Sequence, residues 1–181
     1  MRTIRTVGHS NHPIDRFVGL LEAAGVELLV DVRSTPYSRR FPQFGRERLA
    51  MSLRGAGIDY VHEGAALGGK PTDGGDYDAL AARPDFRDAL DRLAAQAQER
   101  TVCLMCAEKE PLACHRTVLV ARRLAERGID VEHLLADGRI EPHAALEEKV
   151  LAGNGGADLF DDRATRLAQA WRTREIAMRR G

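Results

Sequence analysis

The segment CAEKEPLACHR carries the side chains best suited to chemistry in this chain. Cys106 stands where an apolar run ends and charged residues begin, and Cys114, His115 and Arg116 follow at the end of the segment. A thiolate is the reactive form of cysteine, and a nearby base or positive charge favours it. We predict that Cys106 is the nucleophile, with His115 or His9 as its base. A thiolate at Cys114 is the alternative, and spacing alone does not choose between the two.

Other polar residues are predicted to bind an anionic substrate. A guanidinium group pairs well with carboxylate or phosphate, so Arg116 or Arg33 would clamp such a group. Asp31 and Arg33 have a competing structural use as an ion pair. The residues predicted for substrate binding are Arg116, Arg33, Asp31, Ser10, Asn11, Glu108 and Arg40.

A metal site is the main competing chemistry for the same segment. Cys106, Cys114 and His115 are suitable zinc ligands, and His9 or Glu108 would complete a tetrahedron. Seven residues separate the two cysteines, which is more than the short spacing of a zinc knuckle. Adjacent residues on a helix point about 100° apart, so Cys114 and His115 would not readily bind the same ion. GHSN lacks the glycine spacing of a dinucleotide turn, and GxxxxGK[ST] does not occur. We therefore expect no resident metal or cofactor, with zinc as the weaker alternative.

Apolar runs separated by helical patterns indicate the elements that hold these residues. Strands are expected at 2–7, 27–32, 58–62, 101–105 and 131–135, and helices between them, one of which covers 114–127. Parallel neighbours need crossover helices, so the pattern predicts one three-layer α/β domain with a mainly parallel five-stranded sheet and helices on both faces. Ligands bind outside the carboxyl ends of such strands, where the candidate residues stand, so we expect one pocket there. Cys103, inside a strand, is assigned to the core.

Two glycine-rich stretches and a helical tail complete the chain. The loop at 63–75 is long enough to be functional, and its tip is expected to be mobile. Residues 1–153 are assigned to the α/β domain and 154–181 to a linker and helical extension. The apolar stripe of Phe160, Ala164, Leu167 and Trp171 is typical of a helix that docks on the core or, as the alternative, on a second subunit to form a homodimer.

Composition limits the partners. The 181 residues include 27 basic and 27 acidic side chains, so the field that would hold the chain on DNA or an anionic membrane is missing. A local site at Arg39, Arg40 and Lys70 leaves nucleic acid as a weaker alternative. No apolar stretch reaches the roughly 20 residues of a membrane span, and three cysteines give no disulfide framework. A cytoplasmic protein is expected.

In this order GHSN, DVRSTPYSRRFPQF, LGGKP and CAEKEPLACHRT resemble the domain-of-unknown-function family 488, over residues 3–145. The resemblance implies a small α/β protein, mostly bacterial or archaeal, without an established activity. A looser likeness is to rhodanese-type sulfurtransferases and cysteine phosphatases, in which DVR ends one strand and a reactive cysteine ends another. Arg116 lies ten positions after Cys106 rather than six, and Pro111 interrupts the loop, so this likeness implies a layout and no reaction.

Three functions remain open at this point. The first is an enzyme, a cysteine-dependent transferase or hydrolase acting on a small anionic or nucleotide-like substrate. The second is a non-catalytic module that binds phosphate or nucleic acid at the same edge. The third is a zinc-stabilised domain.

Overall fold

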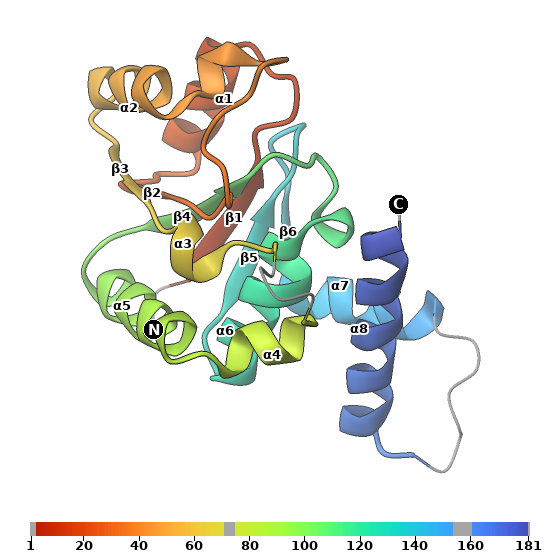
Figure 1. The fold of residues 1–181 in the computed structure, drawn as a ribbon. Helices are drawn as coiled ribbons and strands as arrows, with labels where there is room; N and C mark the ends of the chain where they lie inside the picture. The colour runs from red at the N-terminus through yellow and green to blue at the C-terminus, as the bar shows by residue number, and fades with distance from the viewer. Residues whose placement is uncertain (1–2, 71–74, 154–160, 181) are drawn as a thin grey trace.

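The computed structural model describes residues 3–70, 75–153 and 161–180, which build an α/β fold around one mixed sheet (Figure 1). The strand order is β3-β2-β4-β1-β5-β6. The first five strands pair in parallel, which confirms the predicted α/β class and mainly parallel sheet. They are β1 (Ile4–Gly8), β2 (Leu28–Asp31), β3 (Asp59–His62), β4 (Val102–Cys106) and β5 (Val131–Leu134).

The prediction of five strands was wrong, because the described chain holds a sixth, β6 (Ile140–Pro142), antiparallel to β5. Its three residues are at least partly exposed, so they carry no apolar pattern. The turn before it was visible in the sequence. Gly138 has a φ of 90°, and Asp137 accepts a hydrogen bond from the Arg139 amide, so residues 136–138 form a three-residue hairpin loop with glycine in the left-handed position.

Helices cover both faces of the sheet. On one face lie α1 (Ile14–Ala23) and α2 (Arg46–Gly55), whose buried leucines and Phe17 pack against alternate residues of the central strands. The other face carries α5 (Pro84–Glu99), α6 (Arg122–Glu126) and the short α4 (Tyr77–Ala82), and Figure 1 shows α5 opposite α1 and α2. Cys103 is 0% exposed within the first of these two cores.

The segment after β4 departs from the predicted helix at 114–127. A single 3-10 turn, η2 (Pro111–Ala113), comes first, and Cys114 is extended with φ −138° and ψ 139°. The helix then begins with a π-helical stretch, η3 (Arg116–Ala121), which runs into α6. Pro111 is suited to the first position of a helical turn, so the proline in the loop starts a separate turn.

The C-terminal tail docks on the core. Helix α7 (His143–Gly153) contacts α8 (Arg163–Arg180), and Trp171 of α8 is 1% exposed and stacks on His143 at 5.6 Å between ring centroids. The remaining short elements are η1 (Pro42–Phe44) and α3 (Gly64–Leu67). The mobile tip predicted for loop 63–75 falls mostly on 71–74, and most of the predicted linker falls on 154–160; both lie outside the described residues. Within the described part of the chain, no helix has the length and apolar character to cross a membrane.

Candidate functional site

Three neighbouring strands deliver the candidate residues to one edge of the sheet. β4 lies between β1 and β2, and Gly8 is in register with Cys106. Backbone pairing continues past the strand ends, because the amides of His9 and Ser10 donate to the carbonyls of Cys106 and Ala107, each at 2.9 Å. Ser10 takes a positive φ of 49°, a strained conformation for a residue other than glycine. The loops at this edge are therefore held firmly in place.

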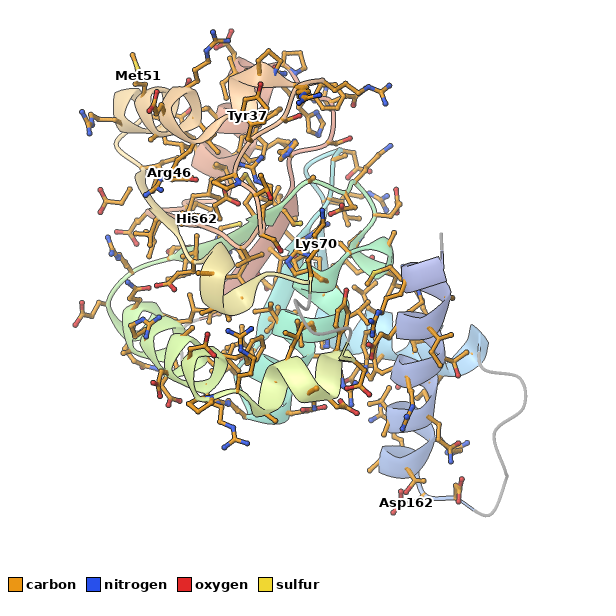
Figure 2. All side chains as sticks on the ribbon, viewed as in Figure 1. Tyr37, Arg46, Met51, His62, Lys70 and Asp162 are labelled. Carbon is orange, nitrogen blue, oxygen red and sulfur yellow. The ribbon has the colours of Figure 1, made fainter. Side chains whose placement is uncertain are left out.

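A cavity of about 1200 Å³ opens at this edge. Eight of the ten residues predicted as catalytic or substrate-binding line it: Cys106, His115, His9, Arg33, Ser10, Asn11, Glu108 and Arg40. Asp31 and Arg116 are not among the lining residues. Figure 2 shows Tyr37 beside α1 and α2, and Lys70 nearer the middle of the molecule, after α3; both also line the cavity.

The two cysteines of the segment meet at one carboxylate oxygen. Glu108 Oε2 lies 3.1 Å from Cys106 Sγ and 3.0 Å from Cys114 Sγ. His115 Nδ1 lies 3.5 Å from Cys106 Sγ and 4.0 Å from Cys114 Sγ. Cys106 is 3% exposed and Cys114 is 1% exposed, so the thiols form the floor of the cavity. We call Cys106, Glu108, Cys114 and His115 the thiol cluster.

The neutral His115 ring has a defined orientation. Its Nε2 lies 2.9 Å from the carbonyl oxygen of Val32, to which only a protonated nitrogen donates. Nδ1, which faces the thiols, is therefore free to accept a proton. Burial alone would lower the pKa of His115, but the hydrogen bond and negative charge of Cys114, helped by the Val32 carbonyl, raise it overall.

The protons in the cluster are shared unequally. Burial raises the pKa of Cys114, but the Cys106 hydrogen bond and the positive Arg116 and His115 outweigh burial and lower it overall. The pKa of Cys106 is raised by its hydrogen bond to Cys114 and by burial. Burial and the charge of Cys114 raise the pKa of Glu108. The shifts therefore favour a thiolate at Cys114 over one at Cys106.

Arg116 shapes the loop from beneath. It is 0% exposed, and its Nη1 and Nη2 donate to the carbonyl oxygens of Glu108 and Lys109 at 2.6 and 3.3 Å. Gly8 makes the close approach of this loop possible, because a Cβ there would lie 1.9 Å from the Glu108 carbonyl oxygen. Arg116 thus acts on the thiols through its charge and holds Glu108 through the backbone.

Gly69 and Lys70, in the described part of the glycine-rich segment, form a wall of the site. A Cβ at Gly69 would lie 2.5 Å from Cβ and Cγ of His115. Only a glycine fits there without moving the imidazole. The backbone of this segment therefore lies against the ring and carries Lys70 to the cavity.

Asp31 and Arg33 form a buried pair that anchors the second loop. Arg33 donates to both carboxylate oxygens of Asp31, at 2.9 and 2.6 Å, and Tyr60 donates to the same group at 2.7 Å. Arg33 Nη1 also lies 3.3 Å from His9 Nε2. Burial lowers the pKa of His9 to about 4, so its ring is neutral at pH 7. His9 accepts from Arg33 and stacks on Phe44, with ring centroids 4.1 Å apart.

The electrostatic character of the cavity is cationic. Five of its lining side chains are basic and one, Glu108, is acidic. The basic residues are Arg33, Arg40, Lys70, Lys109 and Arg179. Among the described residues, only Arg33 and Arg179 of these five form an ion pair. Sequence reasoning did not find Tyr77, Lys109 or Arg179 as site residues, and for Arg179 no local signal exists, because its place depends on how α8 docks.

The cluster also has the composition of a metal centre. The ligand atoms of Cys106, Cys114 and His115 all lie within 4.8 Å of one another. Adjacent residues on a helix point in different directions, but this does not prevent Cys114 and His115 from facing one ion, because Cys114 is extended and the helix starts after it. Glu108 stands beside both sulfurs as a further donor.

Comparison with known proteins places these residues in a family. A family model described as "Domain of unknown function DUF488" matches residues 13–123, more than half of the chain. The match covers the thiol cluster, Arg33 and the LGGKP segment. No curated protein and no solved structure matches the chain. The chain belongs to the DUF488 family, as its motifs predicted.

Proposed function

We propose that the cavity is the active site of a cysteine-dependent enzyme, a transferase or hydrolase, that acts on a small anionic substrate. One observation carries the proposal: two thiols meet at one carboxylate oxygen, with an imidazole nitrogen beside them, at the floor of a cavity whose other charged lining residues are basic. Nucleophile, proton carrier and anion-binding groups are thereby present together.

The directions of the pKa shifts divide the roles. Cys114 holds the negative charge and is the thiolate that attacks, so the nucleophile assigned to Cys106 from the sequence moves to its partner within the same pair. Cys106 donates its proton toward that thiolate. In this assignment His115 Nδ1 holds the proton that Cys114 loses, and Glu108, with a raised pKa, supplies a proton to the leaving group, whose bond to the substrate breaks as the thiolate attacks. Arg33 is positioned by Asp31 and His9 to hold the substrate's anionic group.

Thiol alkylation tests this proposal directly. The full chain is treated with iodoacetamide at pH 7, and each cysteine is followed by peptide mass spectrometry. A depressed thiol pKa increases the thiolate fraction, so we expect Cys114 to react at least about tenfold faster than Cys103. Cys103 is the internal control, because burial raises its pKa to about 12.

Single variants separate the two thiols. Cys114→Ser should abolish the fast reaction, and Cys106→Ala should slow it by removing the hydrogen bond that stabilises the thiolate. Cys103→Ser should leave it unchanged. Uniform alkylation of the three cysteines, or none, would overturn the thiol mechanism.

A resident zinc ion is the second candidate, favoured by the three ligand atoms and the histidine tautomer. A metal-ligating histidine usually donates its other N–H to a carbonyl or carboxylate, as His115 does to Val32. Cys106, Cys114 and His115 would hold the ion, with Glu108 beside them, and the ion would supply Lewis acidity at the cavity floor.

Metal analysis distinguishes the two candidates. Protein purified without chelator would carry about one zinc per chain if the site is a metal centre, and chelation would both lower the melting temperature and expose the thiols to alkylation. Metal-free protein with a fast-reacting Cys114, and no stabilisation by added zinc, excludes the zinc centre and supports the thiol enzyme.

A further inference from the structure

The last helix of the chain reaches the same cavity as the thiol cluster. Met178 and Arg179, near the end of α8, line it together with Cys106 and Cys114. Both lie far beyond residue 123, where the family match ends. The cavity is therefore partly built by a segment outside the matched region.

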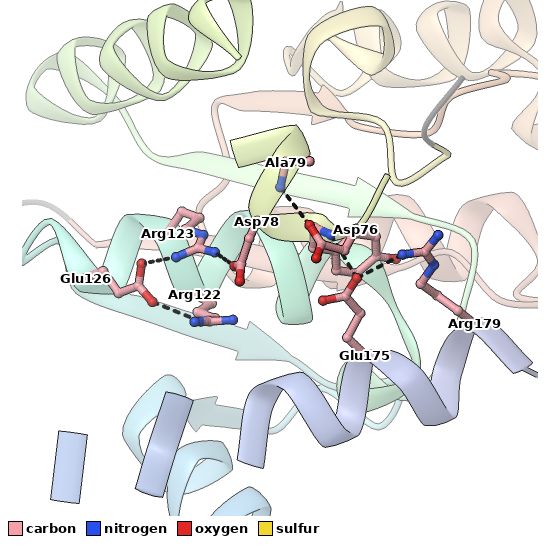
Figure 3. A network of polar contacts seen from close by, with 9 residues as sticks. Asp76, Asp78, Ala79, Arg122, Arg123, Glu126, Glu175 and Arg179 are labelled. Carbon is pink, nitrogen blue, oxygen red and sulfur yellow. Dashed lines mark hydrogen bonds and ion pairs between the residues drawn. The ribbon is translucent and has the colours of Figure 1, made fainter. Parts of the chain in front are cut away.

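Buried contacts fix α8 in this position. Glu175 is 5% exposed, and its Oε1 accepts from the backbone amide of Tyr77 at 2.8 Å and from Nη1 of Arg179 at 3.2 Å. Figure 3 shows Glu175 extending from α8 to the start of α4, with Arg179 beside it. Arg174 donates from Nε to the Leu112 carbonyl at 2.6 Å, next to the thiol-bearing loop. The docked helix thus sets the direction of the Arg179 guanidinium.

Tyr77 connects Arg179 to the thiols. Its side chain is 3% exposed and lines the cavity. Burial and the negative charges of Cys114 and Glu175 raise the pKa of Tyr77, while Arg179 lowers it. The charges of both Cys114 and Arg179 act on the Tyr77 phenol, so a ligand that lies over Tyr77 would lie close to both groups.

The charges of the cavity indicate what such a ligand must be. Its basic residues come from four separate segments, because Arg33 and Arg40 share the loop after β2, and one acidic side chain, Glu108, lies among them. Like charges around one cavity repel, and a multiply charged anion relieves that repulsion. A single small anion would not contact groups spread around about 1200 Å³.

We propose that Arg179 is a substrate-binding residue and that the substrate carries at least two anionic groups, as an organic diphosphate does. This inference rests on the proposed function, because it assigns a ligand to the same cavity. Arg179 binds the anionic group farther from the thiols, and Glu175 positions it.

The test measures binding of inorganic pyrophosphate and of orthophosphate to the full chain by isothermal titration calorimetry at low salt. We expect pyrophosphate to bind more tightly than orthophosphate, and Arg179→Ala to weaken pyrophosphate binding about tenfold or more, as loss of a charge-assisted hydrogen bond does. Arg179→Lys should recover part of the loss. Arg172→Ala is the matched control, because Arg172 is an exposed α8 arginine that is not among the residues lining this cavity.

Each outcome decides the matter. Equal losses in Arg179→Ala and Arg172→Ala would show a general charge effect and overturn the assignment, and so would equal affinity for the two anions or no binding at all. Failure of the thiol mechanism is separate, because it appears as unselective alkylation while pyrophosphate binding and its dependence on Arg179 persist.

Discussion

Two buried polar clusters lie on the same sheet, and their surroundings give them opposite chemistry. The thiol cluster stands at the carboxyl edge, beside β2 and β4, and opens into the cavity. The second cluster joins Thr6 of β1, His133 of β5 and His143 of α7, with contacts of 2.8 Å (Thr6 Oγ1 to His133 Nδ1) and 3.0 Å (His133 Nε2 to His143 Nδ1). We call these three residues the histidine cluster.

The pKa directions separate the clusters. Burial lowers the pKa of His133 to about 2 and that of His143 to about 4, and each stays neutral at pH 7. The pKa of His115 is raised, because an anionic neighbour outweighs burial. None of the histidine cluster lines the cavity, and His143 is covered by Trp171. A buried histidine is thus a candidate for catalysis when a charge partner and a cavity accompany it, and otherwise serves packing.

The largest expected effect is the response of the histidine cluster to acid. His133 and His143 bind a proton in the unfolded chain near pH 6.5 but resist one in the folded protein, so stability falls as the pH drops below about 6.5. Each group contributes up to about 1.4 kcal/mol per pH unit, down to about pH 4 for His143 and further for His133. Urea unfolding at a series of pH values measures this slope.

Substitution identifies the source of that slope. His143→Gln should flatten it between pH 6 and 4. His115→Gln should not, since the stability that His115 contributes is present below pH 6.5 and is lost as the pH rises through its raised pKa. An unchanged slope in His143→Gln would remove the distinction drawn between the clusters.

The next effect in size concerns packing. His143→Ala should lower the free energy of unfolding by about 2 to 3 kcal/mol, because it leaves a cavity under Trp171 and removes the partner of His133. Denaturant unfolding at pH 7 measures the loss, and the matched variant His115→Ala, at a partly exposed position, should cost less. The alkylation rate of Cys114 should change in the reverse order, more in His115→Ala than in His143→Ala. A greater loss of stability from His115→Ala would contradict this assignment.

Much of this arrangement follows from sequence patterns. Apolar runs at β2 and β4 predict buried parallel strands, and the polar residues that follow them predict the pocket edge. β6 escaped detection because three partly exposed residues carry no period, although Asp137 and Gly138 signal the turn. The end of β4 and the glycine-rich segment could be recognised from the sequence because each is marked by its own residue types, charged residues after an apolar run in the first and closely spaced glycines in the second.

The parts that escaped prediction depend on distant contacts. Arg116 has the residue type of an anion binder, but the structure turns it onto backbone carbonyls, and Asp31, whose pairing with Arg33 was the structural alternative, is also covered by Tyr60. The proposed choice of Cys114 over Cys106 depends on the positions of Arg116 and His115 around it. No sequence period shows that α8 returns to the cavity with Arg179.

The smallest expected effect tests whether the two clusters are independent. Thr6→Val keeps the shape of the side chain and removes the hydrogen bond to His133, so it should cost about 1 kcal/mol in the free energy of unfolding. Arg116 is the shared neighbour, because its charge lowers the pKa of both His133 and Cys114, and its Nε has no partner in the described structure. Since Arg116 is fixed by the carbonyls of Glu108 and Lys109, we expect Thr6→Val to leave the alkylation rate of Cys114 within about twofold, a difference of about 0.4 kcal/mol. A larger change would show that Arg116 transmits the state of the histidine cluster to the thiols, and the two clusters would then form one network.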